Sequence, residues 1–199
     1  MKAQVNAYHG TASDFENFSE SFKGSVTDAQ SAKGAFWFTD DPATAKAYSI
    51  YAAETGPINK LLKQHDALEK IAQKSGKGSD WEKVDKLTQQ IDDLGGYDAT
   101  YERRINAKVK DVSIKGDFLE VDAKGKTPQE LGQDGDIDSW LNQQVEKARK
   151  LNKTGLKIKN IDDAVGLYDR PSTHYAVFNP DQIKTKSQLT DIWNKANKK

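Results

Sequence analysis

The stretch Tyr8-His9-Gly10-Thr11 decides how the rest of the sequence is interpreted. It follows residues 4–8, where polar and apolar side chains alternate as in a short β-strand that ends at His9 and Gly10. The imidazole can donate or accept one hydrogen bond, and the glycine leaves the backbone amide and carbonyl unobstructed. A strand end of this kind suits a flat carboxamide, which needs both a donor and an acceptor.

Two later stretches complement the first. Residues 34–40, Gly-Ala-Phe-Trp-Phe-Thr-Asp, indicate an aromatic strand, and Pro42 then marks the first turn of a helix capped by Asp40 or Asp41. Trp37 on the strand and Tyr48 on the helix are placed to present two rings to one cleft. Two facing rings hold a planar heteroaromatic group and favour a cationic one.

The third stretch lies near the far end of the chain. Residues 173–183 indicate a strand with His174 at its start and a turn at its end, and Gln182 is expected to hold the backbone of that turn. His174 is placed to contact a sugar hydroxyl. We predict that the three stretches close on one pocket shaped for a nicotinamide ring.

Composition excludes several classes of function. Hydrophobic residues make up 36% and charged residues 30%, and thirty basic residues balance thirty acidic ones, so no net charge attracts nucleic acid or an anionic membrane. The chain has no cysteine, which excludes disulfides, thiolate catalysis and cysteine metal sites. The three histidines are far apart and lack zinc-helix spacing, so we expect no metal.

The pattern of the chain indicates a single domain over residues 1–199, in the cytoplasm, with neither a signal peptide nor a membrane span. Apolar residues at helical spacing on both sides of a glycine-serine turn predict a helical hairpin inserted at residues 57–96. The small, polar residues 19–33 are interpreted as a flap over a ligand.

The sequence also predicts several further elements. A helical turn is expected after Ser13 or Asp14, a capping box at Thr127, and core positions for Trp81, Trp140 and Trp193. Strands are expected at residues 100–114, 118–122, 156–159 and 174–178, and helices at residues 137–151 and around Leu189 to Trp193.

These stretches resemble the ADP-ribosyltransferase fold of poly-ADP-ribose polymerases and diphtheria-type toxins, whose members share a His–Tyr–Glu set. The chain is most similar to the phage polyvalent-protein and head-morphogenesis-associated ADP-ribosyltransferase domains. The resemblance rests on residues 8–11, 34–48, 118–126 and 175–184, and leaves the hairpin as an insertion. It implies an α+β fold: a split, mixed or antiparallel β-sheet core with flanking helices.

The resemblance also implies roles for individual residues, with NAD as the substrate. His9 would bond the ribose hydroxyl next to nicotinamide, the Gly10 backbone would hold the carboxamide, and Thr11 would sit beside them. Tyr48 matches the second stacking tyrosine, and Trp37 stands where the first one stands. His174 occupies the position of the catalytic glutamate, so His9, Trp37 and His174 form the expected catalytic set.

Two positions depart from the family pattern. Trp37 keeps a stacking face, but His174 cannot offer the negative charge that a glutamate gives to an oxocarbenium-like transition state. Loss of one such electrostatic contact costs on the order of 10²-fold in rate. A neutral histidine can still bond a hydroxyl or act as a base, and a nearby carboxylate such as Asp169 could compensate.

Three functions are compatible with these observations. The first is an NAD-dependent mono-ADP-ribosyltransferase, phage-encoded or toxin-like, that acts in the host cytoplasm. Its expected acceptor is a macromolecule, with protein favoured over nucleic acid. The second is a weak or inactive binding module of the same fold that holds a protein partner through residues 57–94. The third, an RNA 2′-phosphotransferase, predicts a basic groove, which the neutral composition disfavours.

Overall fold

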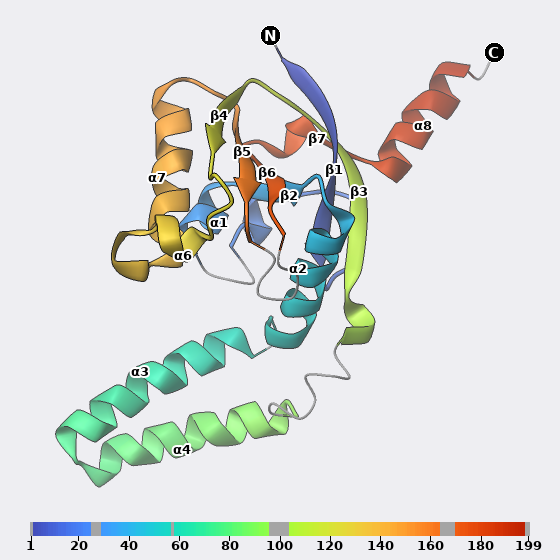
Figure 1. The fold of residues 1–199 in the computed structure, drawn as a ribbon. Helices are drawn as coiled ribbons and strands as arrows, with labels where there is room; N and C mark the ends of the chain where they lie inside the picture. The colour runs from blue at the N-terminus through green and yellow to red at the C-terminus, as the bar shows by residue number, and fades with distance from the viewer. Residues whose placement is uncertain (1, 25–28, 57, 96–103, 164–169, 198–199) are drawn as a thin grey trace.

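A seven-stranded sheet with helices on its flanks forms the body of the protein (Figure 1). The computed structural model describes residues 2–24, 29–56, 58–95, 104–163 and 170–197. In chain order the elements are β1 (Ala3–Thr11), η1 (Glu20–Phe22), α1 (Gln30–Gly34), β2 (Phe36–Thr39), α2 (Pro42–Thr55), α3 (Asn59–Ser75), α4 (Gly78–Asp93), η2 (Arg104–Asn106), β3 (Lys108–Gly116), β4 (Phe118–Asp122), α6 (Pro128–Leu131), η3 (Gln133–Gly135), α7 (Ile137–Lys150), β5 (Gly155–Ile161), β6 (Ser172–Val177), η4 (Pro180–Gln182), β7 (Ile183–Thr185) and α8 (Lys186–Asn197).

The strand order is β4-β5-β6-β2-β1-β3-β7, and the sheet has two wings, one of β4, β5, β6 and β2 and the other of β1, β3 and β7. β1 pairs with β3 along its whole length, from Ala3 opposite Gly116 to Thr11 opposite Lys108. It pairs with β2 only where Tyr8 faces Thr39. Among the described strands only β4 and β5 run parallel, so the sheet is mixed, and the expected α+β fold with a split sheet is confirmed.

Strand alternation places a separate apolar core on each face of the sheet. Phe36 and Phe38 of β2 join one core with Tyr175 of β6. Trp37, between the two phenylalanines, packs on the other core, to which α7 contributes Leu141, Val145 and Ala148. Figure 1 shows α7 beside β4 and β5 at one side of the sheet, and α2 in front of β1 and β2.

Helix α2 begins where its sequence predicts. The Asp41 side chain accepts hydrogen bonds from the backbone N–H groups of Ala43 and Thr44, and Pro42 occupies the first turn. Asp41 also pairs with Arg170, which joins the start of α2 to the start of β6. The cap therefore fixes the helix that carries Tyr48.

Residues 59–93 form the hairpin that the sequence predicts, and it projects away from the sheet in Figure 1. Gly76 ends α3 in the left-handed conformation, with φ of 64°. Between the two helices Val84 and Ile91 are buried, and the imidazole of His65 bonds the Thr88 hydroxyl at 3.2 Å. His65 is half-buried in this seam.

Two local predictions are wrong. Residues 12–18 form no helical turn: Thr11 Oγ1 accepts the Ser13 N–H, and the Asp14 carboxylate pairs with Lys108 and Lys110, so neither candidate caps a helix. β3 starts at Lys108 and not near residue 100, because residues 104–106 form η2. Residues 96–103 lie outside the described part of the chain.

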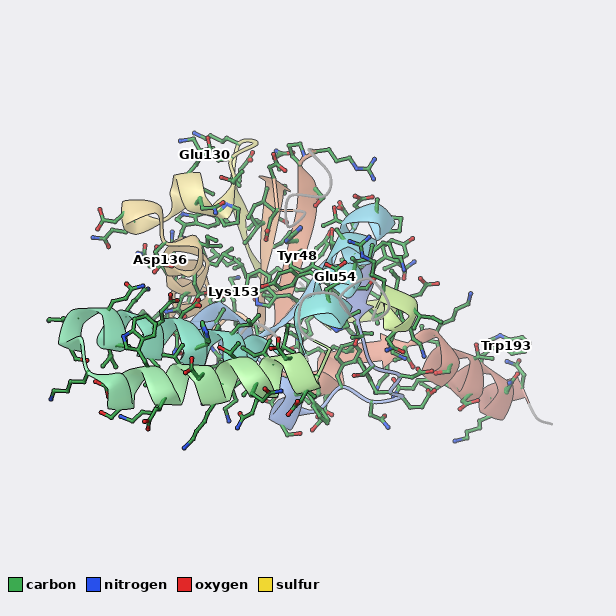
Figure 2. All side chains as sticks on the ribbon, turned by 90° about the horizontal axis from the view of Figure 1, so that it is seen from below. Tyr48, Glu54, Glu130, Asp136, Lys153 and Trp193 are labelled. Carbon is green, nitrogen blue, oxygen red and sulfur yellow. The ribbon has the colours of Figure 1, made fainter. Side chains whose placement is uncertain are left out.

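The expected tryptophan core is only partly present. Trp140 packs against the apolar cluster under α7, but Trp81 is 39% and Trp193 65% exposed. Figures 1 and 2 show α8, which carries Trp193, extending outward from the body. Helical spacing alone does not reveal whether a neighbouring element covers the apolar stripe.

Residues 19–33, interpreted as a flap over a ligand, are not a single loop, because this stretch contains η1 and the start of α1. Lys23 reaches the Phe178 carbonyl at 2.8 Å, and the backbone N–H groups of Gln30 and Ser31 bond the Asp138 carboxylate on α7. The described parts of residues 19–33 are thus tied to the body.

Within the described residues, no helix has the length and apolar character needed to cross a membrane.

Candidate functional site

His9 lies at the junction between the two wings of the sheet. Its Nδ1 is 2.9 Å from the carbonyl oxygen of Trp37, and its ring contacts those of Phe15, Phe18 and Phe38 at centroid distances of 6.2, 5.1 and 5.5 Å. A carbonyl only accepts, so Nδ1 carries the proton and Nε2 of the neutral ring is left as an acceptor.

The surroundings of His9 keep its ring neutral. Burial lowers its pKa below the ordinary value of 6.5, the bond to Trp37 acts in the opposite direction, and the charge of Lys110 lowers it further. A half-buried, neutral imidazole with its proton on Nδ1 can accept a hydrogen bond from a hydroxyl group through Nε2.

Gly10 lies directly against helix α2. A Cβ atom added to it would be 2.1 Å from the carbonyl oxygen of Ala45, 2.6 Å from the amide nitrogen of Ser49 and 3.0 Å from the Cβ of Tyr48. Contacts shorter than 3.0 Å are essentially never made by real Cβ atoms, so this position requires glycine. The close approach sets Tyr48 beside the backbone of β1.

The other two predicted binding residues have local hydrogen bonds. Trp37 donates its indole N–H to the Ser31 carbonyl at 3.1 Å, and its ring packs on the core under α7. The Thr11 hydroxyl bonds both the N–H and the carbonyl of Ser13. In the described part of the chain, the ring contact of Tyr48 is with His174 and not with Trp37.

His174 is buried, with 4% of its surface exposed, and both ring nitrogens have polar neighbours. Nε2 is 3.1 Å from the Ser172 hydroxyl, and Nδ1 is 3.7 Å from a carboxylate oxygen of Asp163. The Tyr48 ring meets the imidazole edge-on, at a centroid distance of 6.2 Å and an interplanar angle of 68°. His174 thus lies between the Tyr48 ring and the Asp163 carboxylate in the contacts that it makes.

The electrostatics of this cluster favour a neutral histidine among negative charges. Burial lowers the pKa of His174, although three carboxylates act in the opposite direction: Asp163, Asp40 and Asp41. Burial and the Asp163 charge raise the pKa of Tyr48 well above its usual value, so its hydroxyl keeps its proton. A cationic ring beside Tyr48 would experience an attractive potential.

A polar cavity of about 390 Å³ opens at the same end of the sheet. Ser172, which bonds His174, is one of its walls, and Asp41 paired with Arg170 forms another. The cavity lining is Asp40, Asp41, Asn160, Arg170, Pro171, Ser172 and Thr173. A group bound there would lie next to the His174 cluster.

The sheet register brings the strands that carry His9 and His174 near each other, but strand alternation turns the two side chains to opposite faces of the sheet. Tyr8 faces Thr39 and Thr39 faces His174, so β1 and β6 are separated by two strand spacings, about 10 Å. His9 and His174, however, lie in different ring clusters, His9 among phenylalanines and His174 beside Tyr48.

The sequence interpretation missed Asp163 and named Asp169, which lies outside the described residues. The available signal was the pair Asp162-Asp163 directly after a strand, but only the pairing of β5 with β6 brings it to His174. Ser172 was missed for a similar reason, because its partner Thr39 is on another strand.

One group of possible metal ligands occurs in the described segments. His65, Asp66 and Glu69 on α3 have ligand atoms within 4.8 Å of one another. Asp66 is exposed, whereas His65 and Glu69 are half-buried on the hairpin, where His65 bonds Thr88 and Glu69 bonds Gln73. Figure 1 shows α3, which carries this group, projecting away from the sheet that contains β6.

A split mixed sheet with a His-Gly strand end facing a tyrosine-bearing helix defines an ADP-ribosyltransferase-like fold. The family model described as ADP-ribosyltransferase in polyvalent proteins matches residues 4–190, so the chain belongs to that family. Neither a search of curated proteins nor a search of solved structures found a match.

Proposed function

We propose that the protein is a mono-ADP-ribosyltransferase that uses NAD as the donor and modifies a macromolecule, with protein favoured over nucleic acid as the acceptor. Membership of an ADP-ribosyltransferase family supports transferase activity in general. The single observation that carries the proposal for NAD is the contact of Gly10 with α2, which sets an open backbone strand end beside the Tyr48 ring.

In this proposal the nicotinamide ring stacks on Tyr48, and its carboxamide bonds the Gly10 backbone. His9 accepts a hydrogen bond from a ribose hydroxyl through Nε2, because the Trp37 carbonyl holds the proton on Nδ1. Trp37 contributes its backbone carbonyl, which holds His9, and Thr11 stabilises the turn that follows His9. The acidic surroundings of His174 favour the cationic nicotinamide ring.

The reaction breaks the bond between ribose C1′ and the pyridinium nitrogen. The electron pair of that bond moves to the ring nitrogen and leaves neutral nicotinamide, while positive charge develops on the ribose. An oxygen or nitrogen of the acceptor then bonds C1′ and gives its proton to water. The site contributes orientation and negative potential, and no redox change occurs.

Incubation with NAD labelled in the adenylate moiety, alone and with a cell lysate, tests the proposal. We expect nicotinamide release and label on macromolecules, both reduced at least tenfold in His9→Ala. Gly78→Ala, a change on the hairpin where nothing lies within 4 Å, is the matched control and should leave both signals unchanged. Wild-type protein that neither releases nicotinamide nor transfers label would contradict the proposal.

One observation favours the alternative, a binding module of the same fold with a weak or inactive site. His174 is neutral and already bonded to Ser172, so it does not itself supply negative charge. In that case the hairpin of residues 57–94 holds a protein partner. Calorimetry measures NAD binding, and a pull-down with and without the hairpin measures partner binding. The binding module predicts a protein partner that is lost with the hairpin and no turnover of NAD.

A further inference from the structure

We propose that Asp163, and not His174, provides the catalytic negative charge of this site. The inference rests on the proposed NAD-dependent transfer and identifies the group that stabilises its transition state. Cleavage of the nicotinamide bond builds positive charge on the ribose, and enzymes that form oxocarbenium-like transition states place a carboxylate beside that charge. A neutral imidazole at position 174 cannot supply it.

The position of Asp163 relative to the two rings supports this role. A carboxylate oxygen is 3.7 Å from Nδ1 of His174, and burial and the Asp163 charge together raise the pKa of the Tyr48 hydroxyl. The charge therefore lies next to the ring on which we place nicotinamide. The Asp163 side chain is 15% exposed and that of His174 5%, so the carboxylate is the more accessible of the two to a ligand.

The remaining hydrogen bonds indicate that His174 positions Asp163. Thr39 donates its hydroxyl proton to Ser172, and Ser172 then donates to Nε2 of His174. This order leaves the proton of the neutral ring on Nδ1, directed toward Asp163. Thr39, Ser172 and His174 together position the Asp163 carboxylate, which takes no proton from the acceptor in the proposed reaction.

The test compares variants in nicotinamide release from NAD. Asp163→Asn should lower kcat about 100-fold with KM within threefold, because the lost interaction acts in the transition state. His174→Glu in the Asp163→Asn background returns a carboxylate to the cluster and should recover at least tenfold. Asp117→Asn, which removes an equal charge from an ion pair with Lys153, is the matched control and should stay within twofold of wild type.

A second pair of variants covers the case in which Asp163→Asn does not fold. Asp163→Glu and Asp163→Gln have the same length and differ in charge, so we expect the Glu variant to be at least tenfold faster. In addition, the His174 pKa followed by NMR should fall in Asp163→Gln but not in Asp117→Asn, with Asp40 and Asp41 still present to act on the ring.

Equal rates for Asp163→Glu and Asp163→Gln, or no recovery by His174→Glu, would overturn the inference while NAD cleavage by the wild type still stands. A wild type that binds NAD but does not cleave it would also overturn it. If the wild type neither binds nor cleaves NAD, the proposed function fails first and the role of Asp163 falls with it.

Discussion

Gly10→Ala is the substitution whose effect follows most directly from the structure. The new methyl group would be 2.1 Å from the Ala45 carbonyl oxygen, roughly 1.3 Å closer than the 3.4 Å at which ordinary contact begins. It would also be 2.6 Å from the Ser49 amide nitrogen. Both are backbone atoms within α2, so neither can rotate away, and β1 and α2 must separate.

The cost of such overpacking is about 3 kcal/mol, toward the upper end of measured cases. For a chain of this size that corresponds to a fall in Tm of about 6–12 °C. Urea unfolding followed by circular dichroism measures the free energy, and a thermal scan measures Tm. Because the Gly10 backbone also contacts the proposed ligand site, NAD cleavage should fall in folded Gly10→Ala protein.

Gly78→Ala is the control for the Gly10 prediction. Gly78 is the first residue of α4 and has nothing within 4 Å of the added methyl group, so alanine should be neutral or stabilise by up to about 1 kcal/mol. If the free energy of unfolding of Gly10→Ala lies within about 0.5 kcal/mol of the wild-type value, the close approach of β1 to α2 is refuted, and with it the placement of Tyr48.

The other predictions concern caps, titration and exposed parts. Asp41→Ala should cost about 1 kcal/mol in urea unfolding through loss of the α2 cap, and an unchanged midpoint would refute the capping role. Burial lowers the pKa of both His9 and His174, so the folded state binds protons less readily than the unfolded state. The free energy of unfolding should therefore be highest above pH 6.5, the ordinary histidine pKa, and should fall below that pH by up to about 1.4 kcal/mol per pH unit for each histidine. If His9→Asn and His174→Asn leave that pH slope unchanged in urea titrations, the burial argument is wrong. Trp193→Ala should change stability by less than about 0.5 kcal/mol, and a larger loss would place Trp193 in a packed interface. Replacing residues 58–95 by a short glycine-serine linker should leave a cooperatively unfolding protein that cleaves NAD, and loss of both would show that the hairpin is not a separable insertion.

Much of the fold could be predicted because its signals are local. The N-cap at Asp41, the capping box at Thr127 and the glycine turn of the hairpin each depend on residues within one turn, and all three form as expected. Gln182 holds the turn after β6, bonding the Asn179 N–H and the Lys115 carbonyl, as expected.

The parts that could not be predicted depend on residues distant in the sequence. Trp193 and Leu189 have helical apolar spacing, but no local pattern reveals that they remain exposed. Asp163 reaches His174 only through the pairing of β5 with β6, and Trp37 contributes to the His9 site through a backbone carbonyl that no side-chain motif encodes. Periodicity predicts which face of an element is apolar, and tertiary pairing decides what that face meets.

A crystal structure with NAD bound tests the central claim most directly. We predict nicotinamide stacked on the Tyr48 ring, its carboxamide bonded to the Gly10 backbone, and the ribose between His9 and Asp163. NAD bound elsewhere, or a crystal that stays empty at saturating NAD, would contradict the account.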